Sequence, residues 1–462
     1  MVLSGSAAIA AALVAQKFGR DAETDGFFAA YGVYVTLTLA AQALRLTAVP
    51  ELTRTGGEAA GSYAASVLVV GLPAALAAAV LAEPIGHAIT GDLPDTSAEV
   101  AADALPWLVA GAVGQVLAAV AAAALAVEDR FVASAIGFSA GGLAGLLVFV
   151  LLADEHGVVA LAWGLALSAL IALAVPLVAL GPQLLRWRPA AVSRRLLVLL
   201  EAAAVPVALQ ALYLLGLRFA AELGIGAVTS LSYAYFFAAV LVAATATSLS
   251  VISTAELTRR GVAAEEAVEH VVHGAWVSLP LIAAAAGVFA LAGDRITPTV
   301  LGDAYGGAVA TELARLVVVL SPWMLAAVGF SLAFPLLYVV ERSRVLVPTA
   351  IGAVLFHIPL SLVLRELWGL EGLAAALAVS TLGVLAALLL ALSPHALVSA
   401  ASSLARVGVV VGVFAAISFG GLSLLADDAI AAVAGLVVYT AALIAVRPRG
   451  LREAWGYVRE LH

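Results

Sequence analysis

Arg45 is the polar residue with the most chemical significance in this sequence, because it lies inside an apolar stretch that runs from about 26 to 49. An arginine within such a helix is costly unless it faces water or an oppositely charged partner, so its position predicts a role in binding an anionic group. The alternative is that Arg45 lies near the helix end and extends its guanidinium to the polar surface.

Glu201 and Gln210 form a second candidate group, on either side of Pro206. We expect both side chains on nearly one face of a helix, together with a carbonyl that Pro206 leaves without its backbone donor. Such groups could line a polar cavity. The alternative for Glu201 is a position at the boundary between the apolar segment and water.

Two Glu-Leu-Thr-Arg segments also stand out. They place Glu51 with Arg54 and Glu256 with Arg259 at matching positions of two similar halves. Their symmetry favours ion pairs that gate a passage from one side. The alternative is a pair of surface salt bridges, which contribute little.

Asp25 precedes an apolar run and could contact a ligand or pair with Lys17 or Arg20. A helix cap is the stronger interpretation, since a carboxylate suits a helix N-terminus. Tyrosine hydroxyls could bind a sugar or phosphate, although such rings more often pack between helices. The tyrosines in question are Tyr213, Tyr233 and Tyr235.

Patterns typical of enzymes are missing from the sequence. There is no glycine-rich phosphate loop with a lysine, and no Ser/His/Asp set on a soluble scaffold. Cysteine is absent, and His273 and His357 have no second ligand at metal spacing, so we interpret them as satisfied polar residues. We therefore expect no enzymatic activity, metal or cofactor, and the lack of a basic tract argues against nucleic acid.

The elements that must position these residues are membrane-spanning helices. Of 462 residues, 64% are apolar and only 11% are charged, too few for the surface of a soluble chain this long. Lipid satisfies no backbone polar group, so the apolar segments must be helices. We predict an all-α polytopic membrane protein with about fourteen spans, at residues 2–18, 26–49, 62–83, 103–127, 131–153, 157–181, 197–220, 225–254, 270–292, 309–340, 346–364, 369–393, 405–425 and 428–446.

Basic residues alternate between the connections as this count requires. Of the 22 lysines and arginines, one is Arg45 and 15 lie after even-numbered spans or in the C-terminal tail. Those after odd-numbered spans are Lys17, Arg20, Arg218, Arg295, Arg315 and Arg365. The positive-inside rule then places both termini in the cytoplasm, and we expect the cytoplasmic (inner) membrane of a bacterium.

An internal repeat relates the two halves. Short matches recur in order at offsets of 205 to 216 residues. They pair Glu51 with Glu256, Pro73 with Pro280, Gly91 with Gly302, Pro106 with Pro322, Glu128 with Glu341, Gly137 with Gly352, and Gly157 with Gly372. Because each copy has six helices, both have the same orientation, which predicts two lobes related by a parallel pseudo-two-fold axis. The predicted divisions are an N-terminal lobe at 1–185, a C-terminal lobe at 186–396, and a final helix pair with tail at 397–462.

Two segments resemble the MurJ-type lipid II flippases of the MOP superfamily. One is Phe18-Gly19-Arg20 followed by Thr24-Asp25-Gly26-Phe27-Phe28-Ala29-Ala30. The other runs from Pro206 to Arg259 and includes the stretch from Gly226 to Ala234. The fourteen-helix count is also similar to that family, whereas MATE antiporters have twelve. The chain departs from the family where cavity arginines are expected, for Ser4, Gly5 and Ile9 stand in the first span, and Tyr235-Phe236 replace Asp-Arg.

The resemblance implies a monomeric flippase that moves a lipid-linked glycan precursor, such as a lipid II-like polyprenyl-pyrophosphate sugar, by alternating access. It also implies that the last two helices accommodate the lipid tail. Membrane lipids and cell-envelope synthesis proteins are the expected partners. Two alternatives are a MATE-like antiporter of small cations and a transport-inactive scaffold in envelope assembly, which the missing arginines favour.

Overall fold

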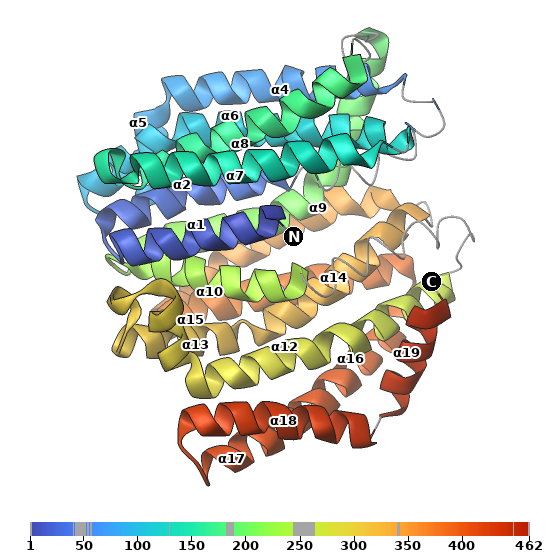
Figure 1. The fold of residues 1–462 in the computed structure, drawn as a ribbon. Helices are drawn as coiled ribbons and strands as arrows, with labels where there is room; N and C mark the ends of the chain where they lie inside the picture. The colour runs from blue at the N-terminus through green and yellow to red at the C-terminus, as the bar shows by residue number, and fades with distance from the viewer. Residues whose placement is uncertain are drawn as a thin grey trace. The chain divides into compact units, whose positions relative to one another are not determined.

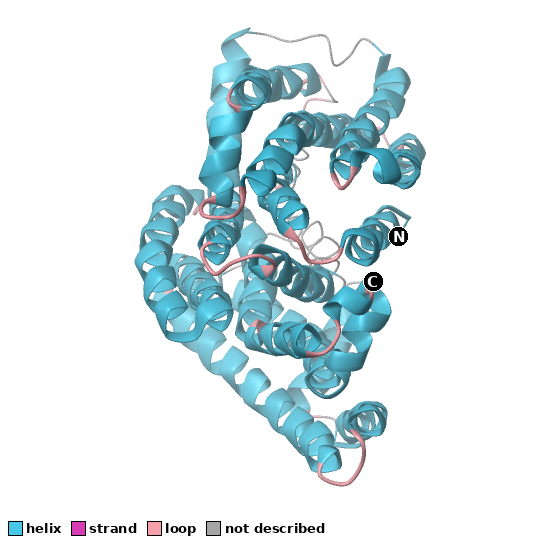
Figure 2. Ribbon diagram, turned by 90° about the vertical axis from the view of Figure 1, so that its left-hand side faces the viewer, coloured by secondary structure: helices cyan, strands magenta, loops and turns pink. Residues whose placement is uncertain are grey.

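The computed structural model is helical throughout. It describes residues 2–39, 41, 52, 55, 58–128, 130–181, 189–243, 264–339, 342–446 and 448–460, and these contain no strand (Figure 2). The helices pack into two compact units, residues 1–229 and 230–462. The all-α prediction is confirmed.

The first unit contains eight helices among the described residues and the beginning of a ninth (Figure 1). They are α1 (Val2–Phe18), α2 (Ala22–Thr38), α4 (Ala60–Val80), α5 (Ala82–Thr90), α6 (Asp95–Val127), α7 (Phe131–His156), α8 (Val159–Leu180), α9 (Pro189–Ala221) and α10 (Ala227–Val242), which continues into the second unit.

The second unit combines long apolar helices with shorter elements. They are α12 (Ala264–Leu301), η3 (Asp303–Tyr305), α13 (Ala308–Val319), α14 (Ser321–Val339), η4 (Ser343–Val345), α15 (Leu346–Leu392), α16 (Pro394–Ala415), a π-helical turn η5 (Ala416–Gly420), α17 (Gly421–Ser423), α18 (Asp428–Val446) and α19 (Arg449–Glu460).

Each of the fourteen predicted spans is helical in its described part. By length and composition, nine described helices could cross a membrane, and ten if the bent pair α13–α14 is one span. Helix α15 holds two predicted spans, and the described parts of α1, α2 and α10 are shorter than a full crossing. These elements together account for the predicted set, and the chain is a polytopic membrane protein.

Helix α15 is a hairpin of two antiparallel arms that turn at Gly369, whose φ is +56°. Residues at similar sequence separations before and after the turn contact each other. Nδ1 of His357 on the first arm lies 2.9 Å from Oγ of Ser380 on the second. Only glycine adopts such a positive φ without strain. Gly369 therefore separates the eleventh and twelfth predicted spans.

A second hairpin joins α7 and α8 through Gly157, with φ of +62°. Gly145 faces Gly164 so closely that a Cβ on Gly145 would lie 2.5 Å from the Gly164 carbonyl oxygen. Gly137 and Gly141 repeat this close packing along the same face. A small-xxx-small face of this kind lets two helix backbones approach in lipid.

Residues paired by the sequence repeat mostly occupy similar places in their own units. Pro73 and Pro280 both lie inside helices, and Gly91 and Gly302 both have positive φ just after one. The pairing of Gly157 with Gly372 is wrong by three residues. Gly369 makes the equivalent turn, while Gly372 packs within the second arm of α15 against the Leu364 carbonyl.

The two packed units do not divide the chain where the repeat does. Helix α9 opens the predicted C-terminal lobe at residue 186, yet it packs on α2, α4 and α5 and belongs to the first unit. The lobe boundaries at 185 and 396 describe the repeat and stay predictions.

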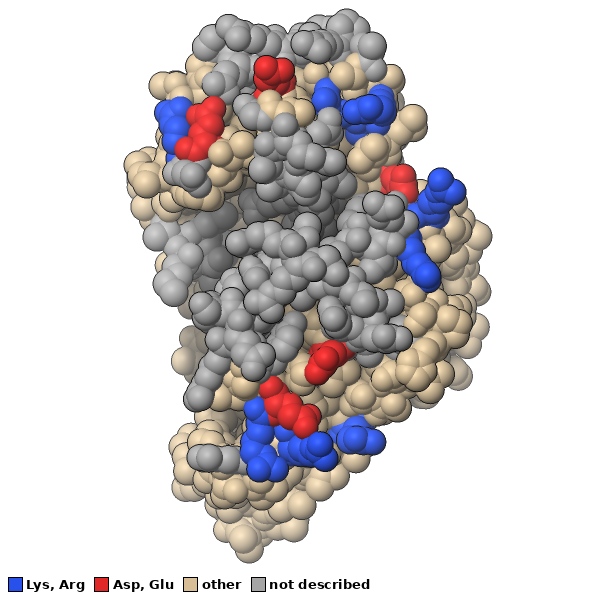
Figure 3. Space-filling view, turned by 90° about the vertical axis from the view of Figure 1, so that its right-hand side faces the viewer, with Lys and Arg blue, Asp and Glu red and all other residues tan. Residues whose placement is uncertain are grey.

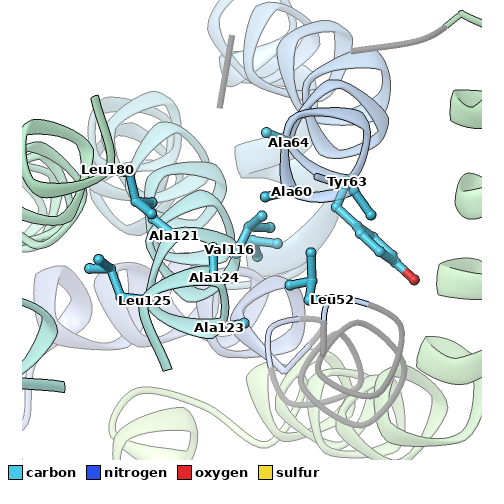
Figure 4. Packing of buried hydrophobic residues seen from close by; sticks show 12 residues of the cluster. Leu52, Ala60, Tyr63, Ala64, Val116, Ala121, Ala123, Ala124, Leu125 and Leu180 are labelled. Carbon is cyan, nitrogen blue, oxygen red and sulfur yellow. The ribbon is translucent and has the colours of Figure 1, made fainter. Parts of the chain in front are cut away.

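The core of the first unit is built largely from alanine. The small side chains of α4 and α6 allow close helix packing around Leu52, Leu125 and Leu180 (Figure 4). Tyr63 belongs to this cluster, and its hydroxyl points away from the other labelled side chains (Figure 4). Burial of these residues holds α4, α6 and α8 together, and α6 in turn packs on α2, which carries Asp25.

Candidate functional site

Five of the predicted site residues lie outside the described residues, so their roles stay predictions. They are Arg45 and the four predicted gate residues Glu51, Arg54, Glu256 and Arg259.

Asp25 lies at the start of α2, fully buried, and its carboxylate caps the N-terminus of α10. Its oxygens accept hydrogen bonds from the backbone N–H of Gly226, from the backbone N–H of Thr229 at 2.8 Å, and from the Thr229 hydroxyl. A carboxylate at this place also meets the positive end of the α10 dipole. The geometry favours the helix-cap interpretation, although the capped helix is α10 rather than α2.

The loop before α2 is joined to the loop before α10 by a second contact. Nε of Arg20 donates to the Gly226 carbonyl at 2.8 Å, and a Cβ on Gly226 would overlap the Arg20 side chain. Lys17 instead pairs with Asp154 at 2.6 Å. Helix α2 has its own cap, Asp21, which accepts from the Thr24 N–H at 2.8 Å.

We expect Asp25→Ala to lower the free energy of unfolding by about 3 kcal/mol, because two buried amides and a hydroxyl lose their acceptor. Asp21→Ala is the matched control, since this exposed cap should cost only about 1 kcal/mol. Thermal unfolding of the purified variants in detergent measures both. If Asp25→Ala is as stable as the parent but inactive, Asp25 binds substrate instead.

Glu201 and Gln210 do not share a face of α9. Nine residues turn an α-helix through about 900°, or two and a half turns, which puts them on opposite sides. Gln210 is 3% exposed, while Glu201 is only partly buried. The shared-face expectation was wrong, and the two side chains cannot form one local group.

Tyr233 is buried in the second unit, with its ring edge-to-face against Tyr305 at a centroid distance of 5.3 Å. Tyr235 similarly packs on Trp323, at 4.8 Å between ring centroids. These arrangements favour the packing alternative for both tyrosines. Tyr213 is also fully buried, within the first unit.

Arg195 is buried, although the predicted spans leave it in the connection between residues 181 and 197. The predicted span begins at 197, whereas α9 begins at Pro189 and carries Arg195 one to two turns inside the helix. Its guanidinium lies 5.3 Å from the centre of the Tyr63 ring, a cation–π contact between α9 and α4. The one feature of the sequence that could have indicated this burial is a basic residue directly before an apolar run.

His357 is a satisfied polar residue, as predicted. Besides Ser380, it contacts Ser361, whose Oγ lies 3.1 Å from Nε2. No group of three potential metal ligands occurs within the described part of the chain.

The second unit contains an apolar groove. Its volume is about 420 Å³, within the range of small-molecule sites. Its walls come from α12, the α13–α14 pair, α16 and the π-turn, through residues such as Ile282, Leu291, Leu325 and Gly412. Among the described residues that line it, Ser321 is the one with a polar side chain. Such a lining suits a hydrocarbon chain.

The π-turn closes one side of this groove. Phe419 from the turn packs so tightly against α12 and α18 that a Cβ on Gly435 would lie 2.6 Å from its ring, and one on Gly287 would overlap it. The Tyr439 hydroxyl of α18 donates to the Pro280 carbonyl of α12 at 3.0 Å. Helices α16 and α18, which lie beyond the sequence repeat, thus help build and brace the groove.

Several solved structures have a fold similar to that of this chain. The chain is similar to the lipid II flippase MurJ in an inward closed conformation, with a TM-score of 0.74 and 14% identity over 96% of this chain and 97% of that one. It is also similar to an inward-facing multidrug resistance MATE transporter of the MOP superfamily, with a TM-score of 0.64 and 11% identity over 88% and 95%. The Vibrio cholerae MATE transporter VcmN in its bent form gives 0.52 and 17% over 88% and 95%.

No protein-family model matches the sequence, and no curated protein does either. The structural similarities therefore concern the fold. The chain has the fold of MOP-superfamily transporters, and the resemblance to the MurJ type is confirmed at that level over nearly its whole length.

Proposed function

We propose that this protein moves a lipid-linked glycan precursor across the cytoplasmic membrane by alternating access. The observation that carries the proposal is the apolar groove between α12, α14 and α16. A polyprenyl tail needs an apolar surface that it can occupy while its headgroup moves, and the groove supplies one beside the helix pair that follows the repeat. The fold, similar to that of a lipid II flippase, supports the same class of substrate.

The polar headgroup needs a cation, because burying a pyrophosphate without a counter-charge is prohibitive. Arg45 is our candidate for this role, with Glu201 and Gln210 as separate polar positions along α9 rather than one cluster. The gate role of Glu51, Arg54, Glu256 and Arg259 is part of the same proposal.

A flipping assay tests the function directly. Purified protein in vesicles is given a fluorescent polyprenyl-pyrophosphate glycan, and the fraction exposed on each leaflet is followed with an impermeant quencher. Faster exchange than in protein-free vesicles, with no effect on a labelled phosphatidylcholine, is expected. Accumulation of a small cationic dye without glycan exchange would favour the antiporter alternative, and neither activity would favour the scaffold.

Arg45→Ala should lower the flipping rate at least about tenfold, because a charge-assisted hydrogen bond to phosphate contributes about 1.5–3 kcal/mol. Arg45→Lys keeps the charge and should retain part of the rate. The assay compares the three proteins at equal amounts in the vesicles. An unchanged rate in Arg45→Ala would mean that the side chain extends to the lipid headgroups instead.

A further inference from the structure

The C-terminal helix α19 lies at a membrane surface by necessity. It begins at Arg449, three residues after α18 ends at Val446. Three extended residues span at most about 11 Å, so α19 starts that close to the end of a spanning helix. Helix α19 is also strongly amphipathic in sequence, which is the pattern of helices that lie in the interface.

One side of α19 is fixed to the protein. Ala454 is fully buried, and Gly450, four positions earlier, packs against the indole of Trp276 on α12. A Cβ on Gly450 would overlap the Trp276 ring nitrogen. These contacts set the rotation of α19 about its axis and leave two other sides facing outward.

The two outward sides differ in charge. Arg452 and Trp455 lie three positions apart, with Leu451 one turn before Trp455, so these residues share one side. Arg452 is exposed, and 57% of Trp455 is exposed. On the other side, Nε of Arg449 donates to Oε1 of Glu453 at 2.9 Å, and the two opposite charges cancel. Among the side chains of α19 that the structure describes, the net positive charge therefore lies on the tryptophan side.

We propose that the side of α19 formed by Leu451, Arg452 and Trp455 binds anionic phospholipid headgroups of the adjoining leaflet. Tryptophan prefers the headgroup level of a bilayer, and arginine near an anionic surface is attracted to it. Figure 3 shows basic side chains at the end of the second unit that carries α19, with acidic side chains beside them. One tryptophan and one leucine are too small an apolar area for a stable protein interface, which needs about 800 Å² from each partner. This inference stands independently of what the protein transports.

The natural absence of cysteine makes a direct test possible. Gly456 is exposed on α19, and a Cβ there meets nothing within 4 Å, so Gly456→Cys can carry a polarity-sensitive fluorophore. The labelled full-length protein is placed in nanodiscs of phosphatidylcholine alone or mixed with phosphatidylglycerol. We expect emission at shorter wavelength in the anionic discs, and added salt should reverse the change.

Arg452→Gln and the double variant Arg449→Gln/Glu453→Gln are the matched pair of variants. Removing Arg452 should weaken the attraction of this side of α19 to anionic headgroups about fivefold, as expected for one arginine near such a surface. The double variant removes both members of the Arg449–Glu453 pair, keeps the net charge of α19, and should leave the emission unchanged. Identical emission in both lipids, equal effects of the two variants, or a change that needs added cell extract would each overturn the proposal, the last by indicating a protein partner.

Discussion

Gly412→Trp is expected to slow the transport of a lipid-linked substrate by about tenfold or more while the protein remains folded. Gly412 lies on α16 and lines the apolar groove, where a Cβ would meet nothing within 4 Å. An indole at this position takes the space that we assign to the lipid tail. Overfilling a site costs about 1–3 kcal/mol, so the flipping rate should fall by about tenfold or more.

Gly383→Trp controls for the size of the new side chain. Gly383 lies in the second arm of α15, in the same unit, and its Cβ position is equally open, but it is not part of the groove. Both variants should show the same melting temperature and monodispersity as the parent in detergent. If the two flip lipid equally well, the groove is not the path of the tail.

The positions of helices were predictable because lipid imposes one rule on every apolar segment. A stretch long enough to cross hydrocarbon must satisfy its backbone internally, so span positions followed from hydropathy alone. The turn at Gly369 was placed within a few residues, between the spans predicted at 346–364 and 369–393, since glycine marks such breaks. The bend between α13 and α14 was not predicted, because 309–340 was expected to be one helix.

Contacts between distant segments were not predictable in the same way. The carboxylate of Asp25 could cap either its own helix or another, and only the packing of α2 beside the start of α10 decides which. The length of α9 and the burial of Arg195 likewise depend on α4, which supplies Tyr63. A charge next to an apolar run resembles a loop residue until its tertiary partner is known.

The family resemblance predicted a groove for a lipid tail at the two helices after the repeat, and that a tail binds there stays a proposal. The groove of the structure is lined by the first of these helices together with α12, α13 and α14, and this construction could not be predicted. Nothing in the sequence marks Ala416–Gly420 as a π-turn, whose extra residue rotates Phe419 between Gly287 and Gly435. Such turns are frequent at functional sites, and this one shapes the groove wall.

Gly164→Leu is expected to cause a large loss of stability in the first unit. Gly164 on α8 faces Gly145 on α7, and a Cβ on Gly164 would overlap the Gly145 carbonyl. The obstacle is backbone rather than a mobile side chain, so the two helices must separate along the hairpin. We expect a loss of about 3 kcal/mol or more, at the upper end for inserting a large side chain into a packed site.

Gly352→Leu is the matched control. Gly137 and Gly145 lie on the same glycine face of α7, and Gly352 is the residue that the sequence repeat pairs with Gly137. Gly352 lies in a helix, is exposed, and has open space at its Cβ position. Leucine there removes the poor helix propensity of glycine and should leave stability equal or slightly higher.

Thermal unfolding followed by size-exclusion chromatography compares the variants. Equal melting temperatures for Gly164→Leu and the parent would mean that α7 and α8 do not pack backbone to backbone. A large loss in both variants would trace the effect to leucine in any helix rather than to this contact. A loss confined to Gly164→Leu would instead tie the stability of the first unit to how closely two helix backbones approach in lipid.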